Sequence, residues 1–103
     1  MASYQVLYWH TIPVQVRARD ENGRASRELP KRFMAAVEKA SMEAGLTGDD
    51  AYLSVYRWGE RQERPGTAAE VAAAVAAELD AGHAEIDWQQ VAAELGAPST
   101  PHA

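Results

Sequence analysis

The sequence predicts an α+β domain, in which a small, mainly antiparallel sheet carries helices on at least one face. The expected order of elements is β-β-β-α-β-α-α. Two observations predict this class. An alternating segment with a hairpin turn comes early in the chain, and stretches with helical spacing of apolar residues follow it. The length of 103 residues is that of one domain.

Three strands are predicted at residues 4–10, 14–19 and 24–28. The first, "YQVLYWH", is apolar enough to be central in a sheet. In the second, "VQVRAR", apolar and polar side chains alternate, which indicates one buried and one solvated face. Asn22-Gly23 is a hairpin signal, because both residues tolerate positive φ. The charged return strand is typical of a sheet edge.

The first helix is predicted to open at Pro30, where the missing N–H costs nothing, and to end at Gly45. Its apolar stripe consists of Phe33, Ala36, Val37, Ala40 and Ala44. A polar turn at 47–50 is expected next. A fourth strand is then predicted at residues 51–58, with Tyr52, Tyr56 and Trp58 on the face that points away from the helices.

Residues 59–66 are charged and predict a mobile loop. Thr67 and Glu70 form the pattern of a capping box, so a helix is expected from Ala68 to Gly82. Asp87 and Gln90 repeat this pattern before a short third helix that ends at Gly96. The expected organisation is therefore a single domain over residues 1–96 and a disordered C-terminal tail over residues 97–103.

Composition excludes several classes of protein. The chain has no cysteine, which excludes disulfides, thiolate catalysis and cysteine metal sites. A net charge of −5 argues against a general nucleic-acid binder, since such proteins need cations to displace phosphate counterions. No secretory signal and no apolar run long enough to span a membrane is evident. We expect a soluble, cytoplasmic protein.

An aromatic surface is predicted on the outer face of the sheet. Leu7 and Trp9 are the bulkier apolar pair of the first strand and are expected to point to the helices. The outer face would then hold Tyr4, Tyr8, Tyr52, Tyr56 and Trp58, with Arg17, Arg19 and His10 around them. A monomer rarely leaves so much aromatic area exposed to water.

Three interpretations of this surface remain open. The third helix or the 59–66 loop could cover it, it could be a protein–protein interface, including that of a homodimer, or it could hold a small molecule. A single-stranded RNA platform also uses exposed rings, but the acidic balance disfavours it. The predicted interaction face consists of Tyr8, His10, Arg17, Tyr52, Tyr56, Arg57 and Trp58.

No catalytic set emerges from the motifs. His10 is the only histidine in an ordered aromatic setting, and no histidine spacing suits a metal, so neither a metal nor a cofactor is expected. Adjacent Asp49 and Asp50 fit a turn better than an acid/base pair. An enzymatic alternative would place His10, Arg57 and Tyr8 around one pocket at the strand ends, where Arg57 contacts an anion and His10 transfers a proton.

The third helix carries one further stripe, whose members are Trp88, Val91, Ala92 and Leu95. It either covers the core or contacts a partner.

The chain resembles a family of small bacterial domains called virulence factor, which also occur beside helical repeats in conserved virulence factor C-type proteins. The similar segments are "YWHTIPVQVRARDENGR", "LPKRFMAAVEKASMEAGLTGDDAYLSVYRWG" and "PGTAAEVAAAVAAEL". The resemblance implies an accessory or adaptor domain and supplies no catalytic residues. It also implies a loose association with operons of one-carbon or cofactor metabolism.

From these observations we predict a non-catalytic adaptor domain that docks on a partner protein, or on a second copy of itself, through its aromatic sheet face. The alternative is a small-molecule-binding or enzymatic domain in one-carbon or cofactor metabolism, with a pocket near His10 and Arg57. The predicted partners include no nucleic acid and no membrane.

Overall fold

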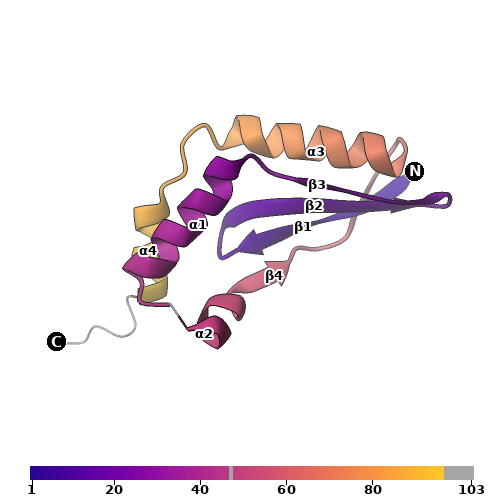
Figure 1. Ribbon diagram of the computed structural model, residues 1–103. Helices are drawn as coiled ribbons and strands as arrows, with labels where there is room; N and C mark the ends of the chain where they lie inside the picture. The colour runs from indigo at the N-terminus through magenta and orange to yellow at the C-terminus, as the bar shows by residue number, and fades with distance from the viewer. Residues whose placement is uncertain (47, 97–103) are drawn as a thin grey trace.

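The computed structural model describes residues 1–46 and 48–96, and it confirms the α+β class with a mainly antiparallel sheet (Figure 1). The predicted tail at 97–103 lies outside the described residues. The elements, in chain order, are β1 (Ala2–Trp9), β2 (Ile12–Asp20), β3 (Gly23–Glu28), α1 (Lys31–Glu43), α2 (Asp49–Leu53), β4 (Tyr56–Trp58), β5 (Gln62–Arg64), α3 (Ala68–Gly82) and α4 (Trp88–Gly96).

The sheet is built around β1. Its strand order is β3-β2-β1-β4, and β5 pairs with the opposite end of β1, on the edge that β4 occupies. The hairpin predicted at Asn22-Gly23 is present, because Asp20 pairs with Gly23 and β3 returns along β2. The pairing of β1 with β2 shifts register between Leu7 and Tyr8, where Val14 is left without a partner in β1.

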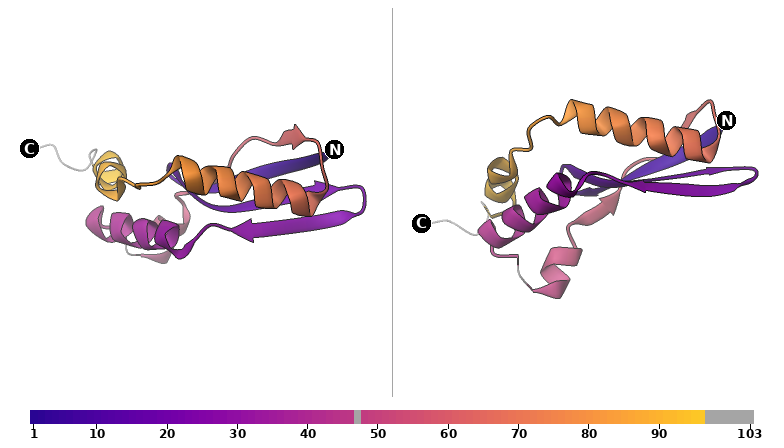
Figure 2. Two further views of the ribbon diagram at one scale, coloured as in Figure 1. Left: turned by 90° about the horizontal axis from the view of Figure 1, so that it is seen from above. Right: turned by 45° about the horizontal axis from the view of Figure 1, so that its top comes forward.

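Helix α3 covers one face of the sheet. It packs on β1, β2 and β3 and buries Val71, Ala72 and Val75 (Figure 2). The predicted capping box is present at its start: the Glu70 N–H donates to Thr67 Oγ1 at 3.1 Å, and the Thr67 N–H donates to Glu70 Oε1 at 3.0 Å. Hydrogen bonds that satisfy the first N–H groups of a helix fix its N-terminus.

Asp20 connects this helix to the hairpin. Its Oδ2 accepts a hydrogen bond from the Ala68 N–H at 2.7 Å, and its Oδ1 accepts one from the Asn22 N–H at 2.8 Å. These two backbone donors lower the pKa of the Asp20 carboxyl, that of Ala68 having the larger effect. One carboxylate therefore shapes the hairpin and fixes the position of α3 over the sheet.

Helices α1, α2 and α4 gather beyond the other end of the sheet, where β1 turns into β2 (Figure 1). The side chains of Trp9, Phe33 and Val37 are each 0% exposed there. The prediction that Trp9 belongs to the core is confirmed. The prediction that Leu7 points to the helices is wrong, because Leu7 pairs with Gln15 and Trp58 on the face of the sheet opposite α3. The apolar stripe of α4 packs towards the same core, with Val91 and Ala92 buried.

The strand predicted at 51–58 is wrong in its first half. Residues 49–53 form the short helix α2, and only Tyr56–Trp58 pair with β1. Contacts distant in sequence accompany the helical turn: the Trp9 indole Nε1–H donates to the carbonyl oxygen of Tyr52 at 3.0 Å, and the two rings lie 5.8 Å apart. The predicted 59–66 loop also contains the short strand β5.

None of the helices in the described part of the chain is long and apolar enough to cross a membrane.

Candidate functional site: the open face of the sheet

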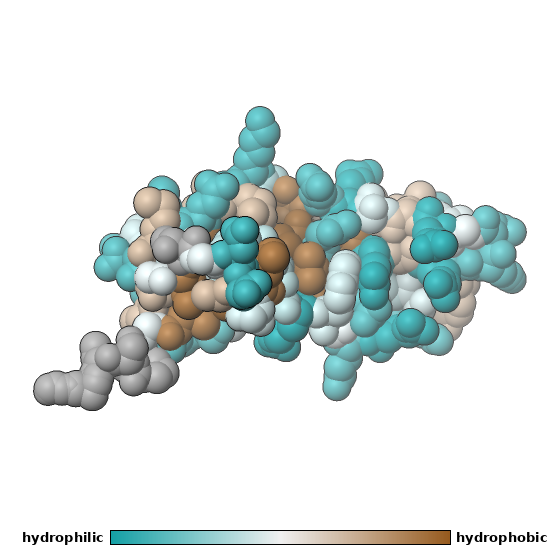
Figure 3. Space-filling view, turned by 60° about the horizontal axis from the view of Figure 1, so that its bottom comes forward, coloured by the Kyte–Doolittle hydropathy of each residue, from teal (hydrophilic) through white to brown (hydrophobic). Residues whose placement is uncertain are grey.

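The face of the sheet opposite α3, which we call the open face, has no helix of residues 1–46 or 48–96 over most of its length (Figures 1 and 2). Strand alternation and the observed pairings assign to it Ser3, Gln5, Leu7, Gln15, Arg17, Arg19, Arg24, Ser26 and Trp58. Apolar side chains gather towards the end near α1 and α4, and hydrophilic ones towards the hairpin (Figure 3).

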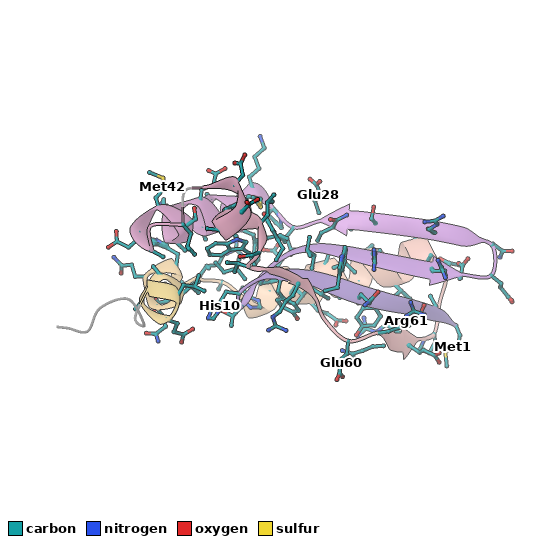
Figure 4. The ribbon with its side chains drawn as sticks, turned by 90° about the horizontal axis from the view of Figure 1, so that it is seen from below. Met1, His10, Glu28, Met42, Glu60 and Arg61 are labelled. Carbon is teal, nitrogen blue, oxygen red and sulfur yellow. The ribbon has the colours of Figure 1, made fainter. Side chains whose placement is uncertain are left out.

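The open face is hollowed into a groove of about 500 Å³. The residues that line it are Ser3, Tyr4, Gln5, Gln15, Arg17, Ala18, Arg19, Arg24, Ala25, Ser26, Trp58 and Arg61. Four strands contribute, and Arg61 belongs to the segment that connects β4 with β5, where it lies beside the sheet (Figure 4). The lining contains arginines, amides, hydroxyls and one tryptophan, and no carboxylate.

Arg17 is held at the centre of the groove by two neighbours. Its guanidinium carbon lies 3.8 Å from the ring centroid of Trp58, and its Nη2 donates to Gln5 Oε1 at 3.0 Å. The other end of the Gln5 amide donates to the carbonyl oxygen of Gly59 at 3.0 Å. A planar guanidinium stacked on an indole and fixed by an amide has already lost part of its conformational freedom, which reduces the entropy cost of binding.

The groove concentrates positive charge in an acidic protein. Arg17, Arg19, Arg24 and Arg61 all line it, and within residues 1–46 and 48–96 no ion pair joins any of them to a carboxylate. The sequence after Thr67 contains six acidic residues and no lysine or arginine. This segment forms α3, which covers the opposite face of the sheet, and α4, which lies beyond its end, so both helices are acidic while the groove is basic.

A second, apolar hollow adjoins the groove. This pocket of about 320 Å³ is lined by Leu7, Val14, Gln15, Glu28, Leu29, Met34 and Tyr56, and it shares Gln15 with the groove. Glu28 lies at the edge of the sheet, near the start of α1 (Figure 4). The open face therefore combines a basic depression with an apolar one.

Tyr56 lines this pocket and contacts Tyr52, which in turn packs against Trp9 of the core. Their hydroxyl oxygens are 2.8 Å apart, their rings meet edge to face at 5.5 Å, and the Tyr56 hydroxyl also donates to Met34 Sδ at 3.8 Å. Burial, assisted by the hydrogen bond with Tyr52, raises the pKa of Tyr56 well above its usual range. Both tyrosines are thus engaged by the scaffold.

The seven residues predicted as one interaction face occupy different places. Arg17 and Trp58 meet on the open face. Tyr52 and Tyr56 pack at the end of the sheet near Trp9 and Met34. The three remaining residues, Tyr8, His10 and Arg57, do not join the Arg17–Trp58 pair.

Tyr8 and Arg57 are cross-strand neighbours on the opposite side of the sheet from Leu7 and Trp58, and the guanidinium of Arg57 lies 5.8 Å from the Tyr8 ring. His10, with a φ of 58°, follows the last residue of β1, and its Nε2 lies 2.7 Å from Glu94 Oε1 of α4. Hydrogen bonds from Gln90 and then His10 lower the pKa of Glu94. Neither His10 nor Arg57 lines the groove or the pocket.

Among the described residues there is no group of three or more histidines, aspartates and glutamates that could hold a metal ion.

The sequence contained the signal for the groove arginines. The alternation in 14–19 predicts Arg17 and Arg19 on one face, and the Asn22-Gly23 turn brings Arg24 beside Arg19, as the pairing shows. Gln5 and Arg61 could not be found this way. Their roles depend on β4 and the following segment lying against β1, over fifty residues away in the sequence.

Comparison with known proteins agrees with the resemblance seen in the sequence. The model of the family described as Virulence factor matches residues 7–94 of the 103-residue chain. No curated protein and no solved structure gives a significant match.

Proposed function

The chain belongs to the Virulence factor family, and we propose that it is a non-catalytic docking domain that binds a partner protein through its open face. One observation carries the proposal: a sheet face without a covering helix is hollowed into a groove, and Arg17 is fixed at its centre on Trp58 and Gln5. Tryptophan and arginine are the residues that most often dominate protein–protein interfaces.

The charge of the groove favours a partner other than a second copy of this chain. In a two-fold symmetric dimer the same patch would face itself, so the four arginines would meet the same four arginines. Like charges placed against each other across an interface cost several kcal/mol. A head-to-tail arrangement would produce rings or open filaments and not a two-fold dimer. Docking on a different protein meets neither objection.

No observation favours the alternative of an enzyme that uses His10 and Arg57. Each of these side chains is engaged elsewhere, His10 with Glu94 and Arg57 over Tyr8. The chemistry expected of them requires that both face one ligand. We therefore retain the docking function alone.

Site-specific photo-crosslinking in the native host tests the proposal. A photoreactive phenylalanine analogue is placed at Ser26, which lines the groove, and in a second protein at Ala77, which is exposed on α3. We expect position 26 to form a discrete adduct with a partner that mass spectrometry identifies, and position 77 to form none with it.

The same adduct must depend on the groove. The double change Arg19→Glu and Arg24→Glu, added to the position-26 probe, should abolish it, whereas Arg27→Glu on the same strand should preserve it, because Arg27 lines neither hollow. Equal crosslinking from positions 26 and 77, or an adduct that survives the double change, would refute docking through the open face. Light scattering of the purified chain should give the mass of a monomer.

A further inference from the structure

The two hollows of the open face, taken together, define the chemistry of the partner. The basic groove and the apolar pocket lie side by side, with Gln15 in the wall of both. An extended segment that follows the groove would therefore reach the pocket. This inference rests on the docking function proposed above.

The groove suits carboxylates. A guanidinium offers parallel N–H donors that match the two oxygens of a carboxylate, and the pairing is stronger where the arginine is already held in position, as Arg17 is. Arg19, Arg24 and Arg61 supply further cations, and no carboxylate of the groove competes for them. The groove can thus pair with a run of acidic side chains without first breaking ion pairs.

Phosphates of a nucleic acid would also meet arginines, but two features disfavour them. Single strands bind by stacking bases on exposed rings, and two aromatic rings line the groove. The guanidinium of Arg17 lies over the ring of Trp58, and that of Arg64 lies over the ring of Tyr4. The acidic layer of α3 and α4 adds to the net charge of −5 and repels a long polyanion. A short acidic stretch of a protein avoids both difficulties.

The pocket suits one bulky apolar side chain. Leu7, Val14, Leu29 and Met34 provide its apolar lining, and its volume of about 320 Å³ lies at the small end for binding pockets. Methionine is unbranched and adapts to the shape of what it contacts, so Met34 can adjust to different side chains. The Tyr56 hydroxyl is already bonded to Tyr52 and Met34 and is not free to select a polar group.

We infer that the open face recognises an extended acidic segment of a partner protein, whose carboxylates pair with Arg17, Arg19, Arg24 and Arg61 while an adjoining bulky apolar side chain enters the pocket beside Met34. The acidic run provides charge complementarity, and the apolar residue fixes the register of the segment along the face. Neither the groove nor the pocket alone would specify both the charge of the segment and its register.

Fluorescence anisotropy with synthetic peptides tests this inference on the full chain. The probes are a labelled peptide with several glutamates followed by leucine, the same peptide with glutamines for glutamates, the same with serine for leucine, and a labelled oligo-dT. We expect the acidic, leucine-containing peptide to bind, and each single alteration to weaken binding by about tenfold or more, which corresponds to about 1.4 kcal/mol.

Protein variants locate the binding. The double change Arg19→Gln and Arg24→Gln should weaken the binding of the acidic peptide by about tenfold. Met34→Gln should remove the preference for the leucine-containing peptide over the serine-containing one. Arg27→Gln, the matched control on β3, should leave both properties within about twofold. Circular dichroism of every variant establishes that it is folded.

The outcomes separate the inference from the docking function. If no acidic peptide binds while the groove-dependent crosslink at position 26 persists, the partner chemistry is wrong and docking stands. If the crosslink is also absent, both fail. Binding of oligo-dT that depends on Arg19 and Arg24 would overturn the inference in favour of a nucleic acid.

Discussion

Replacing Tyr56 with phenylalanine tests whether the paired tyrosines belong to the scaffold or to the docking surface. The Tyr56 hydroxyl has two contacts, the Tyr52 hydroxyl at 2.8 Å and Met34 Sδ at 3.8 Å. A neutral hydrogen bond contributes about 1 kcal/mol net to stability, and sulfur is a weak acceptor. We therefore expect Tyr56→Phe to lower the free energy of unfolding by about 1 kcal/mol, or Tm by about 4–8 °C.

Urea unfolding followed by circular dichroism measures this effect. Tyr52→Phe should cost a similar amount, and the double variant should cost less than the sum, because the second change no longer leaves a partner unsatisfied. Tyr4→Phe is the control: its hydroxyl makes one long, exposed hydrogen bond to Gln62 at 3.4 Å, so stability should barely change.

The dependence of stability on pH above neutrality gives an independent check of this role. The folded pKa of Tyr56 is raised above its ordinary value of 10.0, so the fold favours the protonated hydroxyl. Its contribution is fully present below pH 10 and is lost as the pH rises towards the folded pKa. Wild-type stability should fall above pH 10, and less steeply in Tyr56→Phe. Two results together would refute the scaffold role. The losses of unfolding free energy in Tyr52→Phe and Tyr56→Phe would be strictly additive, and the stability of wild type and Tyr56→Phe would fall equally at alkaline pH. The two hydroxyls would then be independently solvated.

Further predictions concern the core and the two carboxylates that connect elements. Phe33→Ala should lower the free energy of unfolding by about 3–5 kcal/mol in urea titrations, because the side chain is 0% exposed; a loss similar to that of a surface variant would contradict its place in the core. Asp20→Asn should lower Tm at neutral pH. Because the folded pKa of Asp20 is below 3.8, this deficit should be constant above that pH and shrink as the pH falls through the folded value, and a deficit that persists in acid would exclude the carboxylate as its cause. Glu94→Gln should speed amide hydrogen exchange in α4, because it removes the contact of Glu94 with His10, the residue that follows β1. The difference in exchange between wild type and variant should disappear once the pH falls well below 4.5; equal exchange at neutral pH would show that packing alone holds the helix.

Local patterns predicted most elements, and long-range contacts account for those they missed. The start of α3 needs only Thr67 and Glu70, three residues apart, and the β2–β3 hairpin needs only its turn. Residues 51–53 instead enter a helix. Asp49 and Asp50 in the first turn favour it, and the distant Trp9 contacts Tyr52 by hydrogen bond and by ring packing. Strand β5 escaped prediction because "QER" lacks apolar residues and pairs at an edge.

Missed long-range contacts also explain why the residues of the predicted interaction face lie in different places. The alternation of a continuous strand predicts Tyr52, Tyr56 and Trp58 on one face, but only Tyr56–Trp58 is extended, and Tyr52 lies on α2. Along β1 the alternation continues through Leu7, Tyr8 and Trp9, because the unpaired residue of the register shift is Val14 of β2. Val6 and Trp9 are both buried although they point to opposite faces, since Trp9 packs against Tyr52 of α2. Arg17 could be assigned to the outer face from its own strand, because 14–19 alternates without interruption.

The separation of charge between the two layers also bears on how fast a partner arrives. All ten lysines and arginines precede residue 65, and α3, which lies across the sheet from the groove, contains only acids among its charged residues. An acidic partner is repelled by α3 and attracted to the open face before any contact forms, which raises the association rate. Raising the ionic strength should therefore slow association while leaving the lifetime of the complex nearly unchanged.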